Sequence, residues 1–177
     1  LAAALLAFAL ARPQWPLAIL GGERHTAIII DASTSMAAQA PGGGTRLEAA
    51  KARAGDLIGA IGPRGSVTLI AAGPEARLLD SAGVDGAPRL LAALEAVEAA
   101  GTGSDIAGAL TLAEAALQGL PGARVVVISD GALPALAAEL DGRPAPLPVE
   151  WQPVGGPLDN RAIVALATQN DGGATNL

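Results

Sequence analysis

Two uninterrupted apolar runs constrain the fold of this chain more than any other feature. Residues 27–30 read AIII and residues 125–128 read VVVI. Neither run alternates apolar with polar side chains, so each predicts a strand that is buried on both faces. The sequence between them carries two further strand patterns, at 66–72 and 75–79, and three helical patterns, at 45–61, 87–100 and 104–120. Strands that alternate with helices predict a doubly wound, Rossmann-like α/β fold, with a mostly parallel sheet and helices on both faces.

Local signals indicate where several of these elements begin. Thr45, with Glu48 three residues later, forms a capping box, so a helix should begin directly after Thr45. Ser104 is expected to cap the helix of 104–120. A Gly-Pro turn after residue 72 would let residues 75–79 return beside the preceding strand as a hairpin. The remaining predicted elements are a short helix at 133–140 and strands at 123–129, 148–154 and 160–170.

Composition excludes several classes of function. The chain has 177 residues, a net charge of −6, and 11 scattered Lys and Arg residues, which argues against a nucleic-acid partner. The absence of Cys excludes disulfides, thiolate zinc sites and a Cys nucleophile. The single His, His25, lies at the opposite end of the first predicted strand from Asp31, and this separation opposes a Ser–His–Asp hydrolase. We therefore expect that the chain is not an enzyme.

The apolar segment LAAALLAFAL at residues 1–10 stands outside the α/β pattern. It is too short to cross a bilayer alone, which takes about 20 residues. It could be the end of a truncated membrane helix, the core of a signal peptide or a buried helix. We expect the first of these. The predicted organisation is then the end of a membrane helix with a linker at 1–20, the α/β domain at 21–157 and the start of a truncated β domain at 158–177.

Polar side chains follow the ends of both apolar runs. Asp31 ends the first run with two serines close behind it, and Asp130 follows the second run. The carboxyl ends of parallel strands meet at one edge of a sheet, so these side chains should lie close together. A set of oxygen ligands without His, Cys or Lys suits Mg²⁺ or Mn²⁺ better than zinc. The predicted metal ligands are Asp31, Ser33, Ser35, Ser104 and Asp130, with Thr102 as the alternative to Ser104.

Three segments resemble the motifs of von Willebrand factor A domains. DASTS at 31–35 resembles the Asp-x-Ser-x-Ser motif of the metal-ion-dependent adhesion site, and GSDIAGAL at 103–110 and VVVISDG at 125–131 resemble the second and third motifs. Thr34 and Ser104 depart from the family, which usually has Gly and Thr at these places. The resemblance implies a site where the two aspartates act largely through water. It also implies an open metal position that takes an acidic residue from a partner protein.

The segment ALARPQW at 9–15 in front of such a domain resembles a narrower group, the bacterial membrane proteins similar to the Bat aerotolerance proteins. That resemblance implies anchoring in the cell membrane by one or two helices, with the domain outside the cytoplasm. We thus expect a membrane-anchored domain that binds a protein partner through Mg²⁺. The alternatives are a structural membrane-associated protein with a non-functional metal site and a metal-dependent hydrolase.

Overall fold

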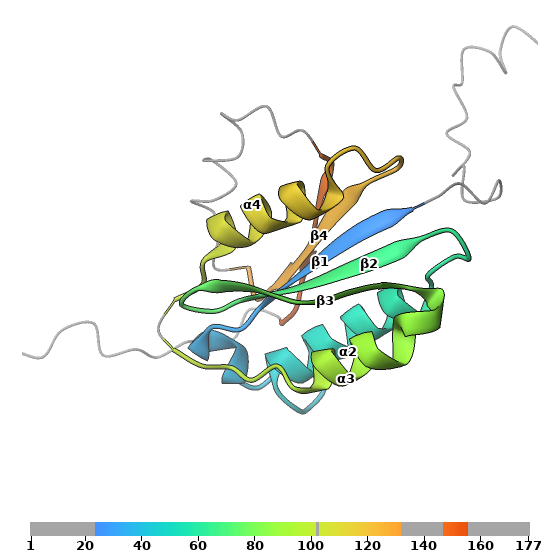
Figure 1. Ribbon diagram of the computed structural model, residues 1–177. Helices are drawn as coiled ribbons and strands as arrows, with labels where there is room; N and C mark the ends of the chain where they lie inside the picture. Colours follow the sequence, from blue (N-terminus) through green and yellow to red (C-terminus); the bar gives the residue numbers. More distant parts are fainter. Residues whose placement is uncertain (1–23, 102, 132–146, 156–177) are drawn as a thin grey trace, which may run out of the picture.

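The computed structural model of the chain describes residues 24–101, 103–131 and 147–155. These residues form a five-stranded sheet in the order β3-β2-β1-β4-β5 (Figure 1). The antiparallel strand β3 lies at one edge, and the other four strands are parallel. The strands are β1 (His25–Asp31), β2 (Ser66–Ala72), β3 (Ala76–Gly83), β4 (Arg124–Ser129) and β5 (Val149–Pro153).

Helices cover both faces of this sheet, as the alternation of strands and helices predicts. α2 (Arg46–Gly59) and α3 (Ala87–Glu95) lie side by side on one face, and α4 (Ile106–Leu117) lies on the other (Figure 1). Two short 3₁₀ helices, η2 (Thr34–Ala37) and η3 (Val84–Gly86), connect the larger elements. The predicted fold class, a doubly wound α/β domain with a mostly parallel sheet, is confirmed.

The central strand β1 explains why the first apolar run is continuous. Ile28 and Ile30 pack into the core under α2 and α3, whereas Ala27 and Ile29 pack into the core under α4. All four residues have no exposed surface. Because side chains of a strand alternate between its faces, a strand covered on both faces needs apolar residues at every position.

The predicted start of α2 is confirmed by its capping box. The Thr45 hydroxyl accepts a hydrogen bond from the Glu48 backbone N–H at 3.1 Å, and the Glu48 carboxylate accepts one from the Thr45 N–H at 2.6 Å. Two otherwise unpaired backbone donors at the helix start are thereby satisfied. The helix ends at Gly59, two residues before the predicted end at Ile61.

The predicted cap of α4 is wrong. Asp105, not Ser104, is the N-cap: one carboxylate oxygen accepts a hydrogen bond from the Gly108 N–H at 2.9 Å. The other oxygen accepts one from the Ala76 N–H at 3.3 Å, which ties the helix to the start of β3. The Ser104 hydroxyl instead donates to the Ala72 carbonyl at 2.9 Å. A carboxylate can accept at both oxygens, so Asp105 serves two backbone donors at once.

Other predicted boundaries also need correction. The helix predicted at 87–100 ends at Glu95, because the chain beyond it turns to hydrogen-bond the loop after β1. The strand predicted at 75–79 continues to Gly83 along β2. The predictions for 1–20, 133–140 and 158–177 lie outside the described residues. Within the described ranges, no helix is long and apolar enough to cross a membrane.

We predict that Asp105→Ala lowers the free energy of unfolding by about 1–2 kcal/mol, because both the helix start and the start of β3 lose an acceptor. Asp105→Asn should retain most of the stability, since Asn caps helices about as well as Asp. Urea denaturation followed by circular dichroism measures both variants. Equal stability of wild type and Asp105→Ala would show that the cap contributes nothing.

Candidate metal centre

The topology of the sheet directs attention to the carboxyl end of β1. The chain passes from β1 to β2 on one side of the sheet, and later to β4 on the other side of β1. Connections that leave a strand in opposite directions open a crevice at its carboxyl end, where ligands bind in α/β sheets. Asp31 is the last residue of β1 and therefore stands at this position.

The carboxylate of Asp31 is buried but well supplied with donors. Asp31 as a whole is only 2% exposed to solvent. One oxygen accepts the Ser33 backbone N–H at 2.9 Å, and the other accepts the Ser129 hydroxyl at 2.6 Å. Hydrogen bonds to the charged form offset part of the cost of burying the charge. Each oxygen keeps lone-pair capacity for a further partner.

The hydroxyls of Ser33 and Ser35 lie together next to Asp31. Their oxygens are 3.0 Å apart, within hydrogen-bonding distance of each other. Ser33 is the N-cap of the short helix η2, and the buried side chain of Met36 anchors that helix in the core. The two serines are therefore held on a turn that is fixed to the core.

Thr34 joins this turn to a second loop. Its backbone N–H donates to the Gly101 carbonyl at 3.2 Å, and its hydroxyl donates to the same carbonyl. The Ala100 N–H donates to the Ala32 carbonyl at 2.9 Å. Gly101 has a φ of +81°, a conformation that favours glycine. These bonds hold the loop after α3 against the turn that carries the serines.

The predicted loop ligand, Ser104, lies at the end of the neighbouring strand β2. Its hydroxyl donates to the carbonyl of Ala72, the residue that pairs with Asp31 across β1 and β2. A hydroxyl that donates one hydrogen bond still has lone pairs to offer a cation. The alternative ligand, Thr102, lies outside the described residues.

The carboxylate of Asp130 is held by an arginine. Arg46, the first residue of α2, donates from Nη1 to Asp130 Oδ2 at 2.6 Å. The two side chains are 6% and 4% exposed, so this ion pair is buried. A Cβ added at Gly155 would come within 3.3 Å of Arg46 Nε, so the glycine makes room for the arginine. Among the described residues, Arg46 Nε has no hydrogen-bond partner.

Sequence reasoning missed two residues of this centre, Arg46 and Ser129. A positive side chain at the first position of a helix is unfavourable because of the helix dipole. The position of Arg46 at the start of α2 therefore indicated that it pairs with a specific acidic residue. Ser129 ends the second apolar run as Asp31 ends the first, and the pairing of Ile30 with Ile128 brings the two ends side by side. Only the structure shows the register of β1 and β4, which places Ser129 beside Asp31.

The donor set fits a small divalent cation. Mg²⁺ binds oxygen at about 2.0–2.1 Å in octahedral geometry, which places adjacent ligands about 2.9 Å apart. The 3.0 Å between the Ser33 and Ser35 oxygens matches that spacing. No group of three His, Cys, Asp or Glu side chains that could hold a metal occurs in the described part of the chain. Protein ligands to a cation at this place would include hydroxyls, and these suit hard cations such as Mg²⁺ or Mn²⁺.

Comparisons with known proteins bear on the family and the fold of the chain. The sequence profile of the von Willebrand factor type A domain matches residues 26–132. The chain is similar to the structure of BatB from Bacteroides thetaiotaomicron, with 26% identity, a TM-score of 0.54, and coverage of 62% of this chain and 54% of BatB. The chain thus spans about half the length of BatB. A comparison with curated proteins gives no match.

Two further solved structures share the fold. An aerotolerance-related membrane protein from Bacteroides fragilis NCTC 9343 is 24% identical with a TM-score of 0.63, over 84% of this chain and 77% of that protein. A von Willebrand factor type A protein from Catenulispora acidiphila is 22% identical with a TM-score of 0.56, over 74% of this chain and 34% of that protein.

We predict that Arg46→Met lowers the free energy of unfolding by about 3–5 kcal/mol in EDTA, because it removes one partner of a buried ion pair. Arg53→Met is the matched control, since Arg53 lies on the same helix and is exposed. Saturating Mg²⁺ should reduce the loss in Arg46→Met, because an ion beside Asp130 would replace the missing charge. Equal losses in the two variants, measured by urea denaturation, would contradict the role given to the ion pair.

Proposed function

The chain belongs to the von Willebrand factor type A domain family, and we propose that it binds Mg²⁺ at this centre and, through the ion, an acidic residue of a partner protein. The observation that carries the proposal is the pair of hydroxyls, Ser33 and Ser35, at the spacing of adjacent octahedral ligands beside a buried carboxylate.

The residues of the centre divide into two groups. Ser33, Ser35 and one loop hydroxyl would hold the ion directly, and Ser104 is preferred to Thr102 as the loop ligand because it lies against β2. Asp31 and Asp130 would act through water, in keeping with the hydrogen bonds that already engage their oxygens. The ion would supply an electrophilic position for a carboxylate from outside.

Charge at the centre favours an acidic ligand. Arg46 already neutralises Asp130, so only Asp31 remains to offset the two positive charges of the ion. The loaded centre therefore keeps a net positive charge close to the surface. The whole chain carries a net charge of −6, which repels an acidic partner at long range. The local charge of the ion has to offset this repulsion, so binding should depend on the metal outright.

We further propose that the protein is not an enzyme and is anchored in the cell membrane through its N-terminal segment, with the domain outside the cytoplasm. His25, the only histidine, hydrogen-bonds Ser66 at the start of the strands, at the end of the sheet opposite the metal centre. No general base of this type therefore stands beside Ser33 or Ser35. The anchoring rests on the apolar sequence of residues 1–10 and on the resemblance to the Bat proteins.

One observation favours a second candidate function. The ion pair of Arg46 with Asp130 gives the acidic centre a partner that is part of the protein itself. A domain stabilised in this way could serve as a structural part of a membrane complex without any metal. Metal titration distinguishes the two functions.

We predict that calorimetry of the chain with Mg²⁺ or Mn²⁺ shows one site. Asp31→Asn should weaken binding about tenfold or more, because it keeps the side-chain shape but removes the charge at the centre. Asp56→Asn, at an exposed position on α2, is the matched control and should bind as wild type does. An unchanged isotherm in Asp31→Asn would remove the metal from this centre.

We predict that the partner binds in Mg²⁺ and not in EDTA. Replacement of the partner's acidic residue by its amide should abolish binding, since the amide keeps the shape and loses the charge. Surface plasmon resonance with the full-length partner measures both effects. Equal affinity in Mg²⁺ and EDTA would favour the structural alternative.

A further inference from the structure

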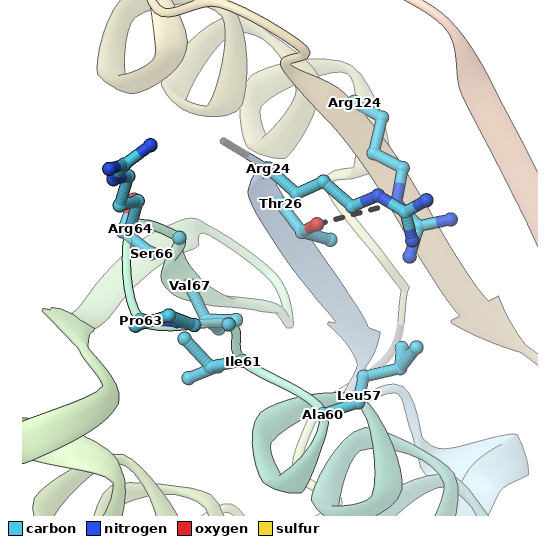
Figure 2. Close-up of a pocket in the computed structure, with 12 residues that line it drawn as sticks. Arg24, Thr26, Leu57, Ala60, Ile61, Pro63, Arg64, Ser66, Val67 and Arg124 are labelled. Atoms are coloured by element: carbon cyan, nitrogen blue, oxygen red, sulfur yellow. Dashed lines mark hydrogen bonds between the residues drawn. The ribbon is translucent and has the colours of Figure 1, made fainter. Parts of the chain in front are cut away.

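A pocket of about 500 Å³ opens at the end of the sheet opposite the metal centre (Figure 2). It lies where β1, β2 and β4 begin, beside the end of α2 and the turn of residues 62–65 that follows it. The metal centre lies where the same strands end. Nothing in the proposed function uses this pocket.

The lining of the pocket is basic. Among the described residues, three arginines line the pocket, Arg24, Arg64 and Arg124, and no Asp or Glu does. The chain as a whole is acidic, with 17 Asp and Glu residues against 11 Lys and Arg residues. A cluster of three arginines in one pocket therefore stands out from the rest of the chain. A concave site that gathers one sign of charge concentrates ligands of the opposite sign.

Two of the three arginines are available to a ligand. Arg24 and Arg64 are exposed, and within the described part of the chain their guanidinium groups make no ion pair or hydrogen bond. Arg124 donates to the Thr26 hydroxyl at 3.3 Å and pairs with Glu150 at 2.9 Å. Its charge is thus partly offset, and its position is fixed. Figure 2 shows the Arg24 side chain extending from the start of β1 toward Arg124, whereas Arg64 lies across the pocket with its guanidinium group directed away from both.

The partial negative charge at the carboxyl end of α2 disfavours an anion in the pocket, but it is too small to make the pocket negative overall. A helix carboxyl terminus carries about half a negative charge. The Ala60 and Ile61 backbone N–H groups already bond carbonyls of the last helical turn, which reduces that charge further. Two unpaired guanidinium groups outweigh it.

Apolar side chains form the other wall of the pocket, among them Leu57, Ile61 and Val67. The volume lies in the range of pockets that hold small organic ligands, about 300–1,000 Å³, and exceeds what a bare phosphate fills. A guanidinium group binds phosphate oxygens with two parallel hydrogen bonds. Arg24 and Arg124 place two such groups on one side of the pocket, and Arg64 adds a positive charge across it. We propose that this pocket binds the phosphate group of a partly apolar molecule, either a soluble phosphate ester or a lipid headgroup.

The test uses the full chain in EDTA, so that a metal at the other end of the sheet cannot bind the phosphate. Calorimetry with hexyl phosphate tests the soluble source, and hexanol tests whether the apolar part alone binds. Co-sedimentation with phosphatidylcholine vesicles, with and without phosphatidylglycerol, tests the lipid source. We expect hexyl phosphate to bind at one site, or phosphatidylglycerol to increase the sedimented fraction, and hexanol not to bind.

Variants assign the binding to the pocket. Arg24→Gln should weaken it about tenfold, as expected for the loss of a charged hydrogen-bond donor. Arg64→Gln removes a charge across the pocket and should weaken it less. Arg53→Gln is the matched control, because Arg53 is exposed on α2 and does not line the pocket. Binding only to phosphatidylglycerol vesicles, with this dependence on Arg24 and Arg64, would identify the lipid source. No binding to either probe, or equal weakening by Arg53→Gln, would overturn the proposal.

Discussion

The hydrogen bonds to the buried carboxylate of Asp31 are the interactions on which the end of the central strand depends. A charge at the end of a central, fully covered strand is costly unless donors surround it. The Ser33 backbone and the Ser129 hydroxyl supply those donors, one from the turn that follows and one from the neighbouring strand. The same contacts fix the turn that carries Ser33 and Ser35. One buried charge thus holds the start of the loop and would supply negative potential for a cation.

The ion pair between Arg46 and Asp130 sets the charge of this centre. Without it, two buried carboxylates would stand at adjacent strand ends and would repel each other when no metal is present. With it, the acidic centre already has a positive partner within the protein, and an ion bound as we propose would keep positive charge for a partner. The arginine comes from the start of α2, whose capping box fixes the first turn of that helix. The capping box, a local signal in the sequence, therefore positions Arg46 for its contact with Asp130, which follows β4.

Much of the fold could be predicted from the sequence, because strands buried on both faces leave an unmistakable apolar pattern and Thr45 with Glu48 marks a helix start. The residues at the ends of the two apolar runs also identified the candidate centre. The cap of α4 could not be predicted with certainty, since Ser104 and Asp105 are both good caps and only the position of β3 decides between them. The roles of Arg46 and Ser129 come from contacts with residues far away in the sequence. Arg46 contacts Asp130, 84 positions away, and Ser129 contacts Asp31, 98 positions away, so no local pattern reveals them.

Nuclear magnetic resonance with Mn²⁺ tests the central claim most directly, because a paramagnetic ion broadens the signals of nearby amides and so locates itself. The account predicts that substoichiometric Mn²⁺ first broadens the amide signals of Ser33, Ser35 and Gly131. The amide signals of Gly62, Arg64 and Gly65, at the opposite end of the sheet, should stay sharp. Uniform broadening across the domain, or broadening confined to exposed acidic residues elsewhere, would contradict a metal centre at the end of β1.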